Sequence, residues 1–174
     1  MTRRVISDAS PLVIFARIGL LSLLEKLFEE VHVSQAVYDE VVPPGEERPG
    51  SREVAQAAGE WLRVHPTPPE EELRRSRSPG LSGADASVIA LAVAQKADLV
   101  LVDERALRRS LRAQGFRVVG VGGLLLRAKE KGLISNVREP LERARQEGLR
   151  LHPALVEKIL REAGELPEPE SSPH

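Results

Sequence analysis

Acidic side chains follow two short apolar segments that lie far apart in the chain. Asp8 comes directly after "VIS", and Asp103 comes directly after "LVLV". Both segments have the length and composition of buried strands. In an open parallel sheet the carboxyl ends of the strands share one edge, and ligands bind at that edge. We therefore expect the Asp8 and Asp103 carboxylates to lie together at the functional edge of a sheet.

Two further acids are expected at the same edge. Asp85 lies in the first turn of a predicted helix that precedes the "LVLV" strand and packs antiparallel to it, so this helix begins near Asp103. Glu40 lies on the apolar stripe of another predicted helix, where a carboxylate needs a partner. Its neighbour Asp39 is on a different side of that helix, next to Gln35. We expect Glu40, and not Asp39, to face the site.

A cluster of this kind has the chemistry of a divalent cation site. Carboxylates that crowd together raise one another's pKa, and a bound cation removes the repulsion. The chain has no cysteine and its four histidines are scattered, so the ligands are hard oxygen atoms. Oxygen ligands favour Mg²⁺ or Mn²⁺ over Zn²⁺, and carboxylate-bound Mg²⁺ is typical of phosphoester chemistry. Ser10 is expected to brace Asp8 and to cap the helix that follows it.

Each acid also has a purely structural interpretation. Asp103 could cap the helix that follows it, Asp8 could belong to a turn, and Glu40 could be an ordinary exposed acid. Asp85 follows Ser82 by three residues, which is the spacing of a capping box. Caps alone, however, would not need to gather at one edge of a sheet, so the predicted convergence favours a functional site.

Arginines are concentrated at two places where they could contact phosphates. One group recurs at spacings of three and four on the helix after Asp103, and its members share a face: Arg105, Arg108, Arg109 and Arg112. The functional interpretation of this face is a phosphate-binding stripe, and the alternative is a solvated surface. The charged segment at 65–80 carries another group, for which a solvated loop is the favoured interpretation: Arg74, Arg75 and Arg77.

The composition is that of an ordinary soluble globular chain. Hydrophobic residues make up 41% and charged residues 29% of the 174 residues, which is enough for one domain with a core. The formal net charge is -1, so a nucleic acid would have to bind at a local patch or through a cation. There is no signal peptide and no apolar run of about 20 residues, so we expect a cytoplasmic protein.

Strands alternate with helices, which predicts an α/β fold: a parallel sheet with helices on both faces. Strands are expected at 4–7, 30–34, 98–102 and 116–121. A helix is expected from Ser51 through Leu62, and the segment at 65–80 is expected to be an exposed insertion. Three helices are expected toward the end of the chain, at about 122–132, 137–147 and 153–163.

Three stretches of the sequence, in this order, resemble the PIN-domain family, in particular a prokaryotic branch close to the VapC-type toxin ribonucleases. They are "VISDASPLVIFARIGLLSLLEKLF", "VSQAVYDEVV" and "LSGADASVIALAVAQKADLVLVDERALRRSLRAQGFRVVGVGGLLLRAKEKGLI". The resemblance implies an α/β/α sandwich with a central parallel sheet, here residues 1–134. Residues 135–165 would be a helical extension packed on this domain, and residues 166–174 a disordered tail, as their composition also predicts.

The resemblance also implies site residues and partners. The family's acidic quartet maps onto Asp8, Glu40, Asp85 and Asp103. Ser10 matches the small hydroxyl residue that supports the first acid, and Glu104 stands where relatives often have a second aspartate. Family members are typically Mg²⁺- or Mn²⁺-dependent ribonucleases. They are often dimeric, and many are toxins held by a small antitoxin protein.

Our hypothesis from the sequence is a metal-dependent endoribonuclease of a toxin-antitoxin pair. We expect Asp8, Asp85 and Asp103 to hold one or two cations, and Glu40 to complete the site or to orient water. In-line attack by water would leave a 5′-phosphate and a 3′-hydroxyl. Two alternatives stay open: an inactive PIN-like module that binds a partner protein, and a metal phosphohydrolase that acts on small phosphoesters. The expected partners are RNA, a small antitoxin and a second copy of the chain, without any membrane.

Overall fold

The strands of the computed structural model, which describes residues 3–166, form one parallel sheet. The five strands lie in the order β3-β2-β1-β4-β5, and each neighbouring pair is parallel. Their bounds are β1 Val5–Ser7, β2 Val31–Ser34, β3 Leu62–His65, β4 Leu99–Leu101 and β5 Val118–Val119. The α/β fold with a central parallel sheet that the sequence predicts is therefore confirmed.

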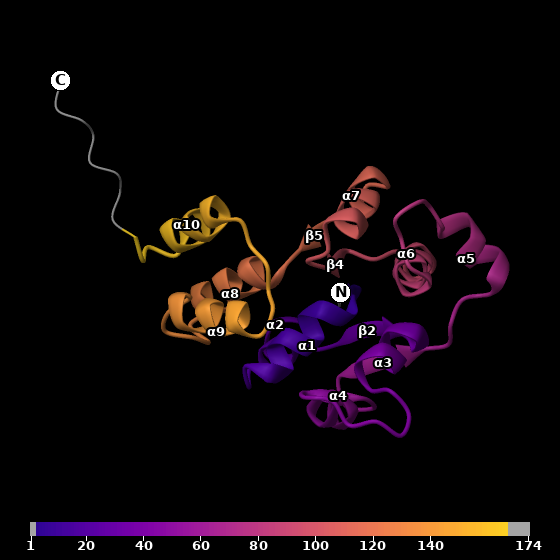
Figure 1. Ribbon diagram of the computed structural model, residues 1–174, viewed down its shortest axis with the longest axis horizontal. Coiled ribbons are helices and arrows are strands. Elements are labelled where there is room, and N and C mark those ends of the chain that lie inside the picture. Colours follow the sequence, from indigo (N-terminus) through magenta and orange to yellow (C-terminus); the bar gives the residue numbers. More distant parts are fainter. Residues whose placement is uncertain (1–2, 167–174) are drawn as a thin grey trace.

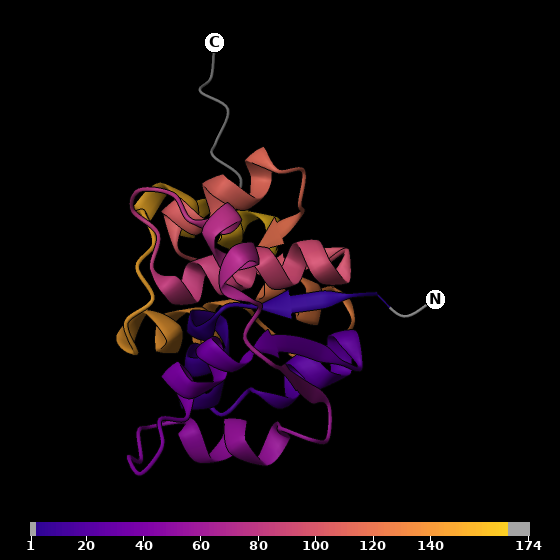
Figure 2. The same cartoon turned by 90° about the vertical axis from the view of Figure 1, so that its right-hand side faces the viewer.

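Helices cover both faces of this sheet. Their bounds are α1 Ala9–Arg17, α2 Ser22–Phe28, α3 Gln35–Val41, α4 Ser51–Ala57, α5 Glu70–Ser76, α6 Gly83–Gln95, α7 Arg105–Ala113, α8 Val121–Glu130, α9 Arg138–Gln146 and α10 Pro153–Glu162. In Figure 1 the strands lie between α6 and α7 on one side and α1, α2 and α8 on the other. Figure 2 shows β1 running between α6, in pink, and the N-terminal helices, in indigo and purple. The arrangement is a three-layered α/β/α sandwich.

The inner strands are buried along their whole length because both of their faces are covered. Every residue of β1, β2 and β4 is buried, as a parallel sheet between two helical layers requires. Val5, Ile6, Val33 and Val100 have no exposed surface. Because the strand is fixed in the core, a polar residue that comes directly after it has a fixed position at the rim of the sheet.

The strand order creates a crevice at the carboxyl ends of β1 and β4. The chain moves outward from β1 to β2 and β3, and then returns to the other side of β1 for β4 and β5. In sheets of this kind ligands bind where the order reverses, because the loops after the two central strands diverge to opposite faces. The register pairs Ser7 with Leu101, so the chain reaches Asp8 and Asp103 at nearly the same level of the edge.

The start of α1 differs from the prediction. Asp8, and not Ser10, is the N-cap residue of α1, so Ser10 lies inside the first turn of the helix. The prediction took the Ser-Pro pair as a capping signal. However, the buried strand ends at Ser7, and one residue is enough for the chain to turn from β1 into α1. The carboxylate of Asp8 is therefore held at the very junction of the two elements.

The edge strand β3 was not predicted, and it overlaps the expected helix at Ser51–Leu62. The helix that forms there, α4, ends at Ala57, and Gly59 adopts a positive φ of 87° that lets the chain turn. Leu62 then pairs with Val31 of β2. The segment at 65–80 is exposed as predicted, but it contains an ordered helix, α5, none of whose residues is buried.

The three helices predicted for the end of the chain are all present, as α8, α9 and α10. They pack on the N-terminal part of the chain, since α8 and α9 both contact α1 and α10 contacts α8. Arg143 of α9 donates a hydrogen bond to the Ile18 carbonyl (2.5 Å) at the end of α1. The predicted disordered tail lies, except for Leu166, outside the described residues.

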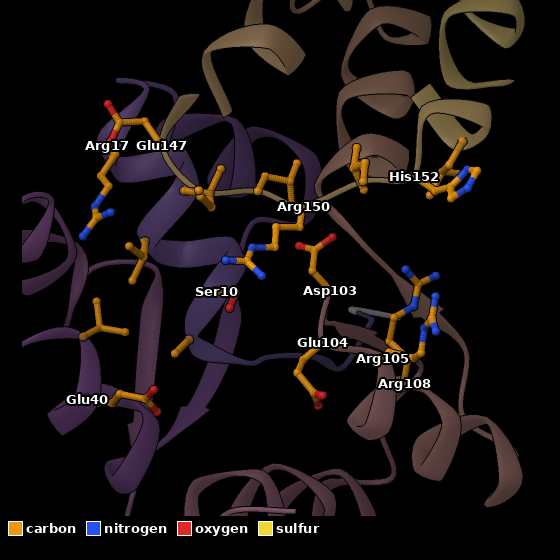
Figure 3. A pocket seen from close by; sticks show the side chains of 18 of the residues that line it. Ser10, Arg17, Glu40, Asp103, Glu104, Arg105, Arg108, Glu147, Arg150 and His152 are labelled. Atoms are coloured by element: carbon orange, nitrogen blue, oxygen red, sulfur yellow. The ribbon is translucent and has the colours of Figure 1, made fainter. Parts of the chain in front are cut away.

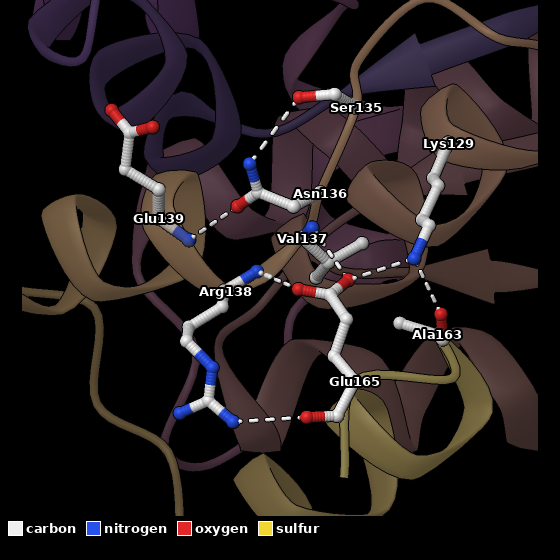
Figure 4. A network of polar contacts seen from close by, with 8 residues as sticks. All are labelled: Lys129, Ser135, Asn136, Val137, Arg138, Glu139, Ala163 and Glu165. Carbon is white, nitrogen blue, oxygen red and sulfur yellow. Dashed lines mark hydrogen bonds and ion pairs between the residues drawn. The ribbon is translucent and has the colours of Figure 1, made fainter.

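Glu165 fastens the segment after α10 to the start of α9 (Figure 4). Its carboxylate accepts the backbone N–H groups of Val137 (2.7 Å) and Arg138 (2.9 Å) and pairs with Lys129 Nζ (3.1 Å). Burial raises the pKa of Glu165, but these hydrogen bonds and the Lys129 charge outweigh burial and hold the pKa below its ordinary value. The end of the described chain is thus anchored and not merely laid on the surface.

Within residues 3–166, no helix combines the length and the apolar character needed to cross a membrane.

Candidate active site

Asp8 is the buried carboxylate at the centre of the site. Its side chain lies at the end of β1, only 6% of the residue is exposed, and its backbone N–H donates to the Leu101 carbonyl (2.9 Å). Burial raises the pKa of Asp8 from 3.8 to about 7, although the backbone N–H of Ala9 opposes the shift. The negative charges of three nearby acids raise the pKa of Asp8 further, each by less than burial does: Asp85, Glu40 and Glu104. A carboxylate held under such repulsion is a group that a cation would stabilise.

Asp85 is brought to this edge by the start of α6. It forms a complete capping box with Ser82: the Ser82 N–H donates to the Asp85 carboxylate (2.9 Å), and the Asp85 N–H donates to Ser82 Oγ (3.0 Å). The structural interpretation of Asp85 is therefore confirmed. It does not exclude a second role, because the negative charge of Asp85 acts on Asp8 and a carboxylate has acceptor capacity beyond one cap.

Glu40 reaches the same edge from α3. Ser34 caps this helix by accepting the Val37 N–H (3.1 Å). Glu40 is exposed and lines the cleft described below, whereas Asp39 accepts a hydrogen bond from Gln35 (2.8 Å). The prediction that Asp39 points toward Gln35 and Glu40 toward the site agrees with this arrangement. Within the described chain, the Glu40 carboxylate has no hydrogen-bond or ion-pair partner.

Asp103 and Glu104 follow β4. The sequence offered two roles for Asp103, a site ligand or the cap of the next helix, and in the structure the capping role belongs to Glu104. Glu104 caps α7 by accepting the N–H groups of Ala106 (3.1 Å) and Leu107 (2.8 Å), so the alternative in which Asp103 caps that helix is wrong. Asp103 instead accepts the N–H of Val121 (3.1 Å), the first residue of α8. Of the two acids it is Glu104 whose charge acts on Asp8.

Asp103 also has a raised pKa. Burial raises the pKa of this carboxyl, while the Val121 N–H and the positive charge of Arg108 lower it. In Figure 3 Asp103 and Glu104 extend from the same turn in different directions. Sequence reasoning treated Glu104 only as a further candidate. The feature of the sequence that could have indicated its role is its position next to Asp103. Two successive acids after a strand can accept N–H groups from the first turns of two different helices.

Four of the five acids share one structural feature: each lies at the start of a different helix, whereas Glu40 lies near the end of α3. Asp8 is at α1, Asp85 at α6, Glu104 at α7, and Asp103 contacts the start of α8. Helix N-termini carry partial positive charge and stabilise nearby anions. The fold can therefore keep several carboxylates close together at one rim, and part of their mutual repulsion is offset before any cation binds.

Ser10 lies on the cleft side of α1 and is exposed. Within the described residues, its hydroxyl forms no hydrogen bond with the Asp8 carboxylate. The side chain that does contact the Asp8 backbone is the buried Ser7, whose Oγ donates to the Asp8 carbonyl (2.8 Å). A supporting role for Ser10 at Asp8 stays a prediction.

A cleft of about 1200 Å³ opens beside this rim (Figure 3), and Asp8 and Asp85 are not among the described residues that line it. Its acidic lining residues are Glu40, Asp103, Glu104 and Glu147, and its basic lining residues are Arg17, Arg48, Arg105, Arg108, Arg109, Arg112 and Arg150. The predicted stripe on α7 therefore lies on the cleft, with all four of its arginines in the lining. Seven arginines against four carboxylates give the cleft an excess of positive charge that the whole chain, at -1, does not have.

The donor chemistry of the rim fits Mg²⁺ or Mn²⁺. All of the candidate ligands are carboxylate oxygens, and one of them, Asp8, is crowded by three other negative charges. As the side chains are oriented in residues 3–166, no three acids or histidines stand close enough together to hold one ion. The carboxylates of Asp85, Asp103 and Glu104 are turned to backbone N–H groups instead. Binding one cation would thus involve rotation of these side chains toward Asp8.

The contact between Asp103 and the start of α8 predicts the effect of Gly120→Ala. A Cβ atom at Gly120 would collide with the Asp103 carboxylate, so the carboxylate would have to leave the Val121 N–H. We expect the free energy of unfolding to fall by about 1–3 kcal/mol, the usual range for an overfilled buried site. Urea unfolding measures this change.

The matched control is Gly83→Ala, where an added Cβ would meet nothing within 4 Å and the backbone is already helical. This substitution should leave stability unchanged or raise it slightly. Equal unfolding midpoints for the two variants would contradict the proposed packing at Asp103.

The family model DUF3368, described as a PIN domain, matches residues 4–165. The chain belongs to the PIN-domain family. The match includes β1 and Asp8 at one end and the Glu165 contact at the other, so it spans the sheet, the acidic rim and the C-terminal helices alike. PIN domains are in general nucleases, which are hydrolases. The closer relation to the VapC branch stays a prediction.

The other comparisons add little to the family match. Several solved structures resemble this chain, among them the PIN domain endonuclease Utp24, at 18% sequence identity and a TM-score of 0.48. That match covers 68% of this chain and 84% of the other. No match was found among curated proteins.

Proposed function

We propose that this PIN domain is a metal-dependent endoribonuclease that cleaves single-stranded RNA with Mg²⁺ or Mn²⁺. The observation that carries the proposal is Asp8, a buried carboxyl with a pKa of about 7 under the repulsion of Asp85, Glu40 and Glu104. Such an arrangement at a topological switch point indicates a function, since the contribution of Asp8 to stability becomes unfavourable as pH rises above about 4. The adjacent arginines supply the complementary charge for a polyanion.

Asp8, Asp85 and Asp103 would hold the cation, with Glu104 as an additional ligand that the structure brings near Asp8. When bound, a divalent cation supplies positive charge against the phosphate and activates water for in-line attack. Glu40, which is exposed in the cleft and unpartnered within the described chain, would orient that water and accept its proton. The new bond would join the water oxygen to phosphorus as the bond to the 3′-oxygen breaks, and the 3′-oxygen would take up a proton from solvent, which leaves a 5′-phosphate and a 3′-hydroxyl.

The biological role that we propose is that of a toxin held by a small antitoxin protein, acting in the cytoplasm as a homodimer. This part of the proposal depends on the resemblance to VapC-type toxins. Induced expression of the chain in a bacterial host should arrest growth, and growth should continue with an Asp8→Asn chain. A small reading frame next to the gene whose product restores growth would identify the antitoxin.

A substrate panel separates the proposal from its alternatives. Single-stranded RNA, single-stranded DNA, duplex RNA and p-nitrophenyl phosphate are each incubated with the protein in Mn²⁺ or in EDTA. We expect cleavage of single-stranded RNA in Mn²⁺ alone, with 5′-phosphate ends. Hydrolysis of p-nitrophenyl phosphate without RNA cleavage would indicate a phosphohydrolase, and no cleavage of any substrate would favour an inactive interaction module.

A further inference from the structure

The connector between α9 and α10, residues 147–152, forms one wall of the cleft. All six of its residues line the cleft, opposite the arginines of α7. From the sequence, the helical extension was expected to pack on the domain or to bind a partner protein. The structure instead brings a segment about forty residues further along the chain to the same space as Asp103 and Glu104.

The connector is fixed in place at both of its ends. Leu149 is buried (7% exposed), and its N–H donates to the Ala144 carbonyl (3.0 Å) of α9. His152 caps α10, because its Nδ1 accepts the Ala154 N–H (3.1 Å). Arg150 lies between these two anchors, so the position of its backbone is set while its side chain is exposed. In Figure 3 the Arg150 side chain extends from the connector into the cleft, toward the side where Ser10 and Asp103 lie.

The charge of Arg150 is not neutralised by a neighbouring acid. Within the described residues, Arg48 alone among the seven cleft arginines forms a salt bridge, with Glu46. Of the thirteen arginines outside the cleft, four form a salt bridge in the described chain, among them Arg52 with Glu47 and Arg63 with Glu30. Burial lowers the pKa of Arg108, and the nearby positive charge of Arg112 lowers it further. Unpaired guanidinium groups that face each other across a cleft are complementary to an anion between them.

On the basis of the proposed function, we propose that the connector is one side of the RNA-binding site and that Arg150 contacts the phosphate of the bond to be cleaved. The strand would pass between Arg150 on one wall and the α7 arginines on the other, with the acidic rim below it. A guanidinium group suits this position because it binds two phosphate oxygens at once.

The cleft favours a single strand. Its volume of about 1200 Å³ is somewhat above that of a small-molecule pocket, and charges on two facing walls can surround one backbone. Duplex RNA, in contrast, is bound across its outer surface over about 16 base pairs. Among the described residues that line the cleft there is no Phe, Tyr or Trp, and the one aromatic ring is the imidazole of His152, so stacking of successive bases has little support. We therefore expect phosphate contacts to dominate binding, with steep salt dependence and little sequence preference.

The test compares Arg150→Ala with Arg161→Ala, which removes the same charge from an exposed position on α10 outside the cleft. Binding of fluorescent single-stranded oligouridylate is measured by anisotropy in EDTA, where cleavage does not interfere, over a range of salt concentrations. Arg150→Ala should weaken binding by about 3- to 10-fold and lower the slope of log affinity against log salt by about 0.7, the share of one phosphate contact on a single strand. Arg161→Ala should change affinity less than about 2-fold, and Arg150→Lys should restore the salt slope.

Equal affinities and equal salt slopes for Arg150→Ala and Arg161→Ala would overturn the proposal, as would tighter binding of duplex than of single-stranded RNA. Unfolding midpoints for both variants check that neither change acts through the fold. Measuring RNA cleavage in Mn²⁺ shows whether a failure concerns the connector as a binding wall or the proposed nuclease activity. Arg150-dependent binding without any cleavage by the unaltered protein would support the connector as a binding wall and overturn the nuclease, whereas normal cleavage with Arg150-independent binding would overturn the connector alone.

Discussion

An Asp8→Asn protein is expected to cleave single-stranded RNA at least about 1000-fold more slowly than the unaltered protein, which corresponds to about 4 kcal/mol of transition-state stabilisation. The substitution keeps the size of a side chain that is only 6% exposed, so the packing between β1 and α1 is retained. It removes the carboxylate that the charges of Asp85, Glu40 and Glu104 repel. The rate of RNA cleavage under single-turnover conditions measures the effect.

The matched control for this variant is Asp39→Asn. Asp39 is exposed, is bonded to Gln35 and does not line the cleft, so the same chemical change there should leave the cleavage rate within about 2-fold, as is usual for surface positions. If Asp8→Asn and Asp39→Asn cleaved RNA equally well, the acidic rim would not be the catalytic centre.

The same Asp8→Asn change is expected to make the metal-free protein more stable at pH 8. Below about pH 4 the Asp8 carboxyl is protonated in both the folded and the unfolded chain. Between pH 4 and 7 the unfolded chain loses this proton while the folded chain keeps it, because burial raises the folded pKa from 3.8 to about 7. The contribution of Asp8 to the free energy of unfolding therefore falls as pH rises, by on the order of 4 kcal/mol at pH 8.

Urea unfolding in EDTA at several values between pH 4 and 8 measures this contribution as the difference between the unaltered protein and Asp8→Asn. The comparison cancels the groups common to both proteins, including His32 and His65, whose lowered pKa values act in the opposite direction as pH falls. A difference that stays constant over this range would mean that Asp8 is not a buried, repelled carboxyl.

A divalent cation should remove this penalty. Because the ion binds the folded chain, Mn²⁺ at about 100 times its dissociation constant should raise the free energy of unfolding by about 2.7 kcal/mol. The gain should be larger at pH 8 than at pH 5, since the proton and the cation compete for the Asp8 carboxylate. The Asp8→Asn protein should gain little at either pH, and an equal gain in both proteins would place the ion elsewhere.

The elements around the site follow from local patterns in the sequence. The buried strands that precede Asp8 and Asp103 are short apolar runs, and Ser34 and Ser82 cap α3 and α6 as their spacing predicts. The missed strand, β3, is a short edge strand whose pattern is weak: two of its residues, Val64 and His65, are only partly buried. Its assignment depends on pairing with β2, which is not a local property.

The site itself could be predicted only to the level of the sheet edge. The convergence of Asp8, Asp85 and Glu40 follows from topology, which places strand ends and helix starts together. The division of roles between Asp103 and Glu104 depends on α8 starting beside Asp103, through a contact 18 residues away. Arg150 had no signal in the sequence, because its place in the cleft depends on how α9 and α10 pack on the sandwich.

The most direct measurement of the central claim is the anomalous scattering of Mn²⁺ in crystals of the protein soaked in MnCl₂. The account predicts a peak bound by the Asp8 carboxylate together with at least one of Asp85, Glu104 and Asp103, and no such peak in Asp8→Asn crystals. A Mn²⁺ peak bound away from Asp8, or a fully occupied rim that is unchanged in the Asp8→Asn crystals, would contradict it.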